Sequence, residues 1–177
     1  MMIHNVRVAL VITGLTSLLF CLPVKAAYDL KGVWHLQDRK NAHASLNMAI
    51  EKAVEGMTYF VRRKATSILE DEAQVCYNMT LALTRMSFIW QCDSQKARRI
   101  SVRANKQISK NADQEEITTT YRKGKRFSSI TVESKFATYT HVWTLISERH
   151  LEYKATIQYK NIPRPLKWTL IYSKVMR

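Results

Sequence analysis

The histidines and carboxylates are the side chains of this 177-residue sequence that could carry out acid–base chemistry, and they are scattered. Beyond residue 26 the histidines are His35, His43, His141 and His150. None of them stands at the spacing of a metal site, and no nucleophile motif or phosphate-binding glycine loop accompanies them. Glu133 and Glu152 are the one carboxylate pair that we would test as acid and base. We therefore predict a protein that is not an enzyme and that uses no cofactor or metal.

Two cysteines, Cys76 and Cys92, remain after the N-terminal segment and favour a structural disulfide. Alternating residues on either side of Leu83-Thr84-Arg85 predict a hairpin that would place the two cysteines opposite each other, within bridging distance. The alternative is a redox-active or metal-binding pair. It lacks a Cys-x-x-Cys spacing and a further soft ligand nearby.

Aromatic and polar side chains share single faces of three expected strands near the C-terminus. These candidate ligand-binding residues are Tyr139, His141, Trp143, Tyr153, Ile157, Trp168 and Tyr172. If those faces point inward, they form an aromatic interior with hydroxyl, imidazole and indole donors, which suits a hydrophobic or amphiphilic small molecule. The alternative is an interior filled by these side chains themselves.

Positive charge is concentrated in the second half of the chain. Residues 93–177 carry 18 basic and 7 acidic side chains, whereas residues 27–92 carry 8 and 7. Four of the cations crowd one turn: Arg122, Lys123, Lys125 and Arg126. This asymmetry favours an anionic partner such as a lipid or lipopolysaccharide surface. Nucleic acid ranks below such a surface because no nucleic-acid-binding motif appears, and the alternative is a set of solvated loops.

The N-terminal 26 residues have the pattern of a secretory signal peptide. Arg7 precedes an apolar stretch from Val8 to Leu22, and Val24-Lys25-Ala26 offers small residues for cleavage after Ala26. The apolar stretch is short for a membrane-spanning helix. We therefore expect a secreted or periplasmic protein with a single domain over residues 27–177.

The remaining chain alternates mostly with the period of strands. Gly32–Leu36 is the first expected strand, and a helical pattern then covers about residues 43–69, with Leu46, Ile50, Phe60 and Val61 on its apolar stripe and Gly56 as the place for a break. Further strands are expected at 75–81, 86–92, 100–104, 116–121, 127–134, 138–147, 151–160 and 166–175. A meander of this length usually closes into a barrel, which leaves no unpaired edge strand. The sequence therefore predicts a mainly β fold, an up-and-down antiparallel barrel of about eight to ten strands with a helical segment after the first.

Two short motifs resemble a known group of proteins. Gly32-Val33-Trp34 resembles the start of the lipocalins and the fatty-acid-binding proteins, together called calycins, and the expected element order is similar to the fatty-acid-binding branch. That branch carries an Arg-x-Tyr in its last strand that grips the ligand carboxylate, where this chain has Leu170-Ile171-Tyr172. The tyrosine matches and the arginine does not, so the resemblance implies the barrel without that carboxylate site.

These features together predict a lipocalin-like protein, secreted or periplasmic, that binds a hydrophobic or amphiphilic ligand next to an anionic envelope surface. The alternative is a non-enzymatic interaction protein with a filled barrel, whose basic face docks on a partner protein or an anionic polymer.

Overall fold

The structure, a computed structural model, describes residues 29–104 and 106–175, so the predicted signal peptide lies outside the described residues. The strands are β1 (Gly32–Leu36), β2 (Asn78–Leu83), β3 (Ser87–Cys92), β4 (Arg98–Ser101), β5 (Lys106–Lys110), β6 (Glu116–Lys123), β7 (Phe127–Glu133), β8 (Ala137–Leu145), β9 (His150–Tyr159) and β10 (Leu166–Lys174). Two helices, α1 (Arg39–Ala53) and α2 (Tyr59–Glu72), lie between β1 and β2. This is the element order that the calycin resemblance implied. No helix among the described residues is long and apolar enough to cross a membrane.

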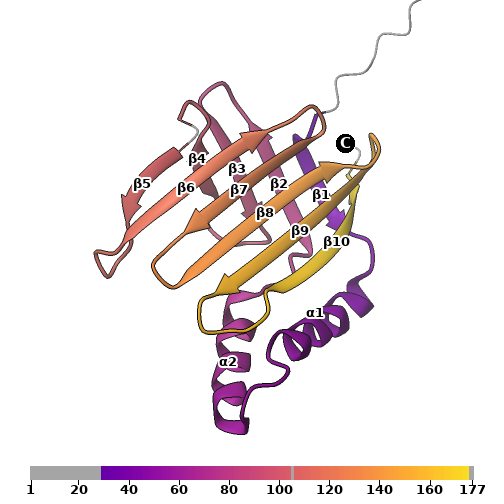
Figure 1. The fold of residues 1–177 in the computed structure, drawn as a ribbon. Coiled ribbons are helices and arrows are strands. Elements are labelled where there is room, and N and C mark those ends of the chain that lie inside the picture. Colours follow the sequence, from indigo (N-terminus) through magenta and orange to yellow (C-terminus); the bar gives the residue numbers. More distant parts are fainter. Residues whose placement is uncertain (1–28, 105, 176–177) are drawn as a thin grey trace, which may run out of the picture.

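The strands form one antiparallel sheet in the order β4-β3-β2-β1-β10-β9-β8-β7-β6-β5 (Figure 1). The sheet curls back on itself because the first and last strands pair, with Trp34 opposite Lys174 and Leu36 opposite Tyr172. β4 and β5 stand at the two ends of this order. Across them, the Gln107 side-chain amide donates to the Ser101 carbonyl at 2.8 Å. The result is the nearly closed up-and-down barrel that the sequence predicted.

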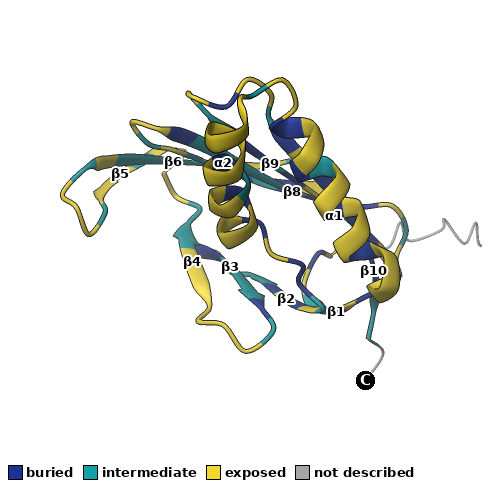
Figure 2. Ribbon diagram, turned by 90° about the horizontal axis from the view of Figure 1, so that it is seen from below, coloured by how far each residue is buried: buried dark blue, intermediate teal, exposed yellow. Residues whose placement is uncertain are grey.

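The core lies between the facing parts of this curled sheet, because most of the strands turn an apolar side inward. In β9, Tyr153 and Ile157 are buried whereas Lys154 between them is exposed. Trp34 and Trp143 are fully buried in the same core. The helices lie across one end of the barrel, as the view from that end shows (Figure 2).

The two helices differ in how they are held. α1 begins where Asp38 Oδ1 accepts the Asn41 backbone N–H at 3.1 Å, and it contacts β10. Its buried residues are Ala42, Leu46, Ile50 and Ala53. Gly56, with φ at +84°, turns the chain between the helices as the sequence predicted. α2 buries only Ala65 and Leu69 and is exposed along most of its length (Figure 2).

The helical prediction needs two corrections. The helices start at Arg39 and end at Glu72, so the segment extends beyond the predicted 43–69 at both ends. The Asp38 cap accounts for the earlier start. Phe60 and Val61 were expected on the apolar stripe that faces the core, and this was wrong: they are 82% and 53% exposed. The break at Gly56 reorients the chain, so one stripe does not continue through both helices.

The sheet departs from the prediction at its two ends. β5 was not expected, because Ile108 is the only apolar residue of Lys106–Lys110, and it is exposed. Hairpin pairing with β6 forms this strand, with Ile108 opposite Thr118. β4 was expected at residues 100–104 and instead covers Arg98–Ser101, where it pairs with β3.

The disulfide is present, but the predicted register of its hairpin was wrong. Leu83 pairs with Phe88 and Met79 with Cys92, so Cys76 precedes β2 and does not lie opposite Cys92. The bridge instead ties the segment between α2 and β2 to the end of β3, with a Cα–Cα distance of 5.4 Å.

Candidate ligand-binding site

A cavity of about 400 Å³ lies inside the barrel, next to the C-terminal end of α2. Five of the seven predicted ligand-binding residues line it: Tyr139, His141, Tyr153, Ile157 and Trp168. They come from β8, β9 and β10, which are neighbours in the sheet. The alternation of strand side chains brings these residues to the inner face. The volume falls within the roughly 300–1,000 Å³ typical of small-molecule sites.

The other two predicted residues, Trp143 and Tyr172, do not line this cavity and instead pack in the core around it. Trp143 packs against Phe88 with ring centres 5.0 Å apart, and its indole N–H donates to the Met79 sulfur at 3.1 Å. The Tyr172 hydroxyl donates to the Cys76 carbonyl at 2.8 Å. Tyr172 therefore holds the segment before β2, and the hydroxyl that matches the calycin motif is engaged within the protein.

A polar pair marks the wall formed by β8 and β9. His141 Nδ1 and the Tyr153 hydroxyl are hydrogen-bonded at 2.8 Å, with their rings nearly parallel at 6.0 Å. The Trp90 ring also packs against His141, and the centres of the two rings are 4.6 Å apart. Burial, reinforced by the Arg98 charge, lowers the pKa of His141 to about 4. The imidazole is therefore neutral near pH 7 and offers the cavity a hydrogen-bonding group without a charge.

A second polar pair lies on the same strands. The hydroxyls of Tyr139 and Tyr159 are hydrogen-bonded to each other at 2.9 Å. Burial, the Tyr159 hydrogen bond and the Glu72 charge all raise the pKa of Tyr139. Both hydroxyls therefore stay protonated, and each retains hydrogen-bonding capacity beyond the pair. Oxygen or nitrogen atoms of a ligand have partners here.

Sequence reasoning missed the residues that bring charge to the cavity. Arg98 on β4 lies over the Trp90 ring, 5.1 Å from its centre, and Asp71 and Glu72 reach the lining from the end of α2. In the sequence, Arg98 counted only toward the charge excess of residues 93–177. Trp90 was also missed as a cavity residue. Its alternation with Phe88 and Cys92 on one face of β3 is the sequence signal that could have identified it. Nothing local to Asp71 or Glu72 indicates that the helix ends against the barrel interior.

Two indole N–H groups at the cavity wall have no hydrogen-bond partner among the described residues. They belong to Trp90 and Trp168, and both nitrogen atoms are buried. A buried donor left without a partner costs about 1–3 kcal/mol. An acceptor atom of a ligand that reached either nitrogen would relieve this cost, so the wall is better suited to an amphiphile than to a pure hydrocarbon.

The disulfide forms part of the wall. Cys76 and Cys92 both line the cavity, and Asp93 accepts the backbone N–H groups of Tyr77 and Asn78 at 3.1 and 2.8 Å. These bonds fix the chain where it leaves α2 and enters β2. The two sulfur atoms and a carboxylate oxygen of Asp93 also lie close enough together to hold a metal ion. The bridge engages both sulfur atoms, so the cluster has a structural role.

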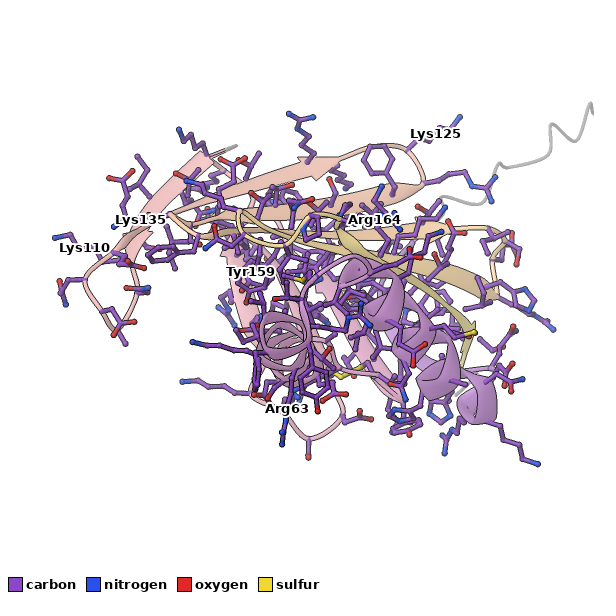
Figure 3. The ribbon with its side chains drawn as sticks, turned by 60° about the horizontal axis from the view of Figure 1, so that its bottom comes forward. Arg63, Lys110, Lys125, Lys135, Tyr159 and Arg164 are labelled. Atoms are coloured by element: carbon purple, nitrogen blue, oxygen red, sulfur yellow. A yellow bond between two sulfur atoms is a disulfide. The ribbon has the colours of Figure 1, made fainter. Side chains whose placement is uncertain are left out.

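The predicted basic turn lies elsewhere, beside a wider groove of about 1,310 Å³. Arg122 and Lys123 line this groove, together with Arg85 and Lys106. Arg126 donates to the Ile146 carbonyl. Lys125 is exposed and lies far from Arg63 of α2 in the view of Figure 3. The turn therefore contributes two of its four predicted residues to the groove.

The chain is similar to several solved structures at low sequence identity. No protein-family model and no curated protein matches the sequence. An SAHS protein from Ramazzottius varieornatus is 13% identical with a TM-score of 0.49, over 85% of this chain and 100% of that one. The REP1-NXSQ fatty acid transporter is 14% identical with a TM-score of 0.47, over 84% and 98%. Fatty-acid-binding protein 1 of Echinococcus granulosus is 14% identical with a TM-score of 0.46, over 83% and 98%. At these values the similarity describes only the general course of the chain.

Proposed function

We propose that the protein is a non-enzymatic carrier, secreted or periplasmic, that holds one hydrophobic or amphiphilic molecule in the barrel cavity and works next to an anionic envelope surface. The observation that carries this proposal is the cavity of about 400 Å³ with its aromatic wall. The wall offers apolar contact from Trp90, Ile157 and Trp168, and polar contact from the His141–Tyr153 pair and the Tyr139 hydroxyl. This combination of broad apolar lining and few placed polar groups is typical of small-molecule sites.

The secretory and anionic-surface parts of the proposal rest on the sequence. The N-terminal signal pattern supports export, and the charge excess of residues 93–177 supports an anionic neighbour. The disulfide is compatible with an oxidising compartment.

The test fills the cavity and leaves the outside of the barrel as a control. Ile157→Phe places a larger ring in the lining, whereas Ile171→Phe makes the same change on β10, where the side chain is only half-buried and outside the lining. The delipidated protein is titrated with N-phenyl-1-naphthylamine, a neutral fluorescent probe, and native mass spectrometry gives the stoichiometry. We expect one probe per protein, at least tenfold weaker uptake by Ile157→Phe, and unchanged uptake by Ile171→Phe. A wild-type protein that takes up no probe would overturn the carrier.

The second candidate is an interaction protein that docks through its basic face on a partner protein or an anionic polymer. The groove lined by Arg85, Lys106, Arg122 and Lys123 favours it. Arg122→Glu with Lys123→Glu would abolish capture of an anionic polymer such as heparin-agarose at physiological salt while probe uptake stays intact. Unchanged retention would exclude this groove as the docking face.

A further inference from the structure

The first turn of α2 exposes three apolar side chains in a row. Tyr59 is 71% exposed, Phe60 82% and Val61 53%. Successive residues of a helix point about 100° apart, so the three side chains surround the start of the helix and do not form a stripe on one side. Figure 1 shows α2 beginning at its end away from the sheet and rising toward the barrel. The exposed turn is therefore a projecting apolar tip.

Three cationic residues follow immediately in the sequence. Arg62, Arg63 and Lys64 are all exposed and surround the helix in the same way, about 4.5 Å further along its axis. Neither of the two ion pairs among the described residues involves them, and the Arg62 guanidinium donates to the Met57 carbonyl at 3.3 Å. Figure 3 shows Arg63 pointing away from the barrel. We call residues 59–64 the α2 tip.

The charges near the tip leave it positive. Glu55 precedes the tip in the chain and is ion-paired with Arg164. The acidic residues of α2, Glu70, Asp71 and Glu72, stand in its last turn at the opposite end. This order, with cations toward the start and acids at the end, is the reverse of what stabilises a helix. A sequence that departs from the stabilising arrangement, and exposes an aromatic pair beside it, indicates selection for something other than stability.

We propose that the α2 tip docks end-on onto an anionic phospholipid bilayer, with Tyr59, Phe60 and Val61 entering the interface and Arg62, Arg63 and Lys64 binding lipid phosphates. Apolar side chains just beyond a ring of cations match the order of the layers in a bilayer, where acyl chains lie below the charged headgroups. Aromatic side chains suit this interface, and each nearby cation strengthens attraction to an anionic leaflet. A nucleic acid would match the cations and leave the apolar turn exposed.

The docking element is joined to the ligand cavity by the helix itself. Asp71 and Glu72, at the end of α2, line the cavity, so one rigid helix runs from the bilayer contact to the cavity wall. The proposal deepens the anionic-surface part of the proposed function and rests on that part. It places the contact on α2, whereas the sequence alone placed it on the turn around Arg122. Probe uptake by the cavity does not depend on it.

The experiment measures co-sedimentation of the protein, without its signal, with vesicles of phosphatidylcholine alone or with 30% phosphatidylglycerol. Two variants disrupt the tip separately: Phe60→Ser with Val61→Ser removes the apolar turn, and Arg63→Gln with Lys64→Gln removes two cations. Met48→Ser with Lys52→Gln on α1 is the matched control, because both of these side chains are exposed. Arg122→Gln with Lys123→Gln tests the rival surface. Circular dichroism and N-phenyl-1-naphthylamine uptake are measured for each variant.

We expect the wild-type protein to bind the anionic vesicles and to leave neutral ones largely free. Each tip variant should bind anionic vesicles at least tenfold more weakly while folding and taking up the probe normally, and the α1 control should bind as wild type does. Loss of binding in the Arg122/Lys123 variant with binding retained by both tip variants would overturn the proposal, as would no binding of the wild-type protein. Lost probe uptake with intact vesicle binding would count against the carrier and leave the tip as the docking element.

Discussion

The two helices of this barrel have nearly the same length and lie at the same end, yet they are built in opposite ways. α1 is capped by Asp38, buries Leu46 and Ile50, contacts β10 and carries Lys52 in its last turn. α2 has no side-chain cap from Thr58, buries two residues and carries acids in its last turn. α1 therefore has a side-chain cap and a favourable cation in its last turn, although Arg39 and Lys40 stand in its first turn, whereas α2 has neither the cap nor the cation. The difference indicates that α1 closes the barrel, whereas α2 is stabilised less and is available for contacts outside it.

Truncation of an apolar side chain should lower the free energy of unfolding much more in α1 than in α2, and this is the largest difference that we expect between the helices. Leu46→Ala removes a side chain that is 4% exposed, and we expect it to lower the free energy of unfolding by about 2–5 kcal/mol. Phe60→Ala removes a larger side chain that is 82% exposed, and stability should change by less than about 0.5 kcal/mol. Urea denaturation followed by far-ultraviolet circular dichroism measures both. Equal losses would mean that α2 packs against the barrel in solution.

Acid should destabilise the cavity wall at His141 of β8. The folded-state pKa of His141 is about 4, below the ordinary histidine value of 6.5, so the unfolded chain binds the proton more tightly. Stability contributed by the neutral imidazole is therefore complete above about pH 6.5 and is lost as the pH falls toward 4. The shift corresponds to about 3 kcal/mol. His141→Gln should flatten the difference between pH 6.5 and 4.5 in urea denaturation. If the variant loses as much stability as the wild type between pH 6.5 and 4.5, the acid sensitivity belongs to other groups.

The caps of the two helices provide a paired test of smaller size. Asp38→Ala removes the bond to the Asn41 N–H and should lower the melting temperature by a few degrees. Thr58→Ala at the start of α2 removes no side-chain cap bond, so its cost should stay within a few tenths of a kcal/mol. Thermal unfolding at fixed protein concentration compares the two variants. A similar loss for Thr58→Ala would show that this hydroxyl caps α2 in solution.

The parts of the molecule that were predictable are those whose physics is local. Alternation in residues 151–159 predicted a strand with one wet face, and Gly56 predicted the break between helices, because side-chain period and positive φ are properties of short segments. The disulfide followed from having two cysteines and a hairpin, although Leu83 pairs with Phe88 in a register that spacing alone did not give.

The parts that were missed depend on contacts between distant segments. β5 forms because β6 pairs with it, and its own residues show almost no apolar alternation. Phe60 continues the helical spacing of α1 in the sequence, so nothing in that spacing reveals that the chain turns away from the core after Gly56. Five cavity residues were found because they alternate on long strands. Arg98 and Glu72 were missed because the closed sheet and the end of α2 bring them to the cavity wall.

Charge reversal in the last turn of each helix should have a small effect on stability. The effect should have opposite signs in α1 and α2, so it tests the difference between them directly. Lys52 stands in the last turn of α1, where a cation favours the helix, so Lys52→Glu should destabilise the protein by about 0.3–1 kcal/mol. Glu70 stands in the last turn of α2, where an anion is unfavourable, so Glu70→Lys should stabilise by a similar amount. Urea denaturation at low ionic strength measures both, and added salt should shrink both differences. Because Glu70 lies outside the cavity lining, a gain in stability with unchanged probe uptake would show that α2 holds a charge order that folding disfavours. A loss of stability in Glu70→Lys would mean that the acidic end of α2 is satisfied by the barrel, and the two helices would then differ in exposure alone.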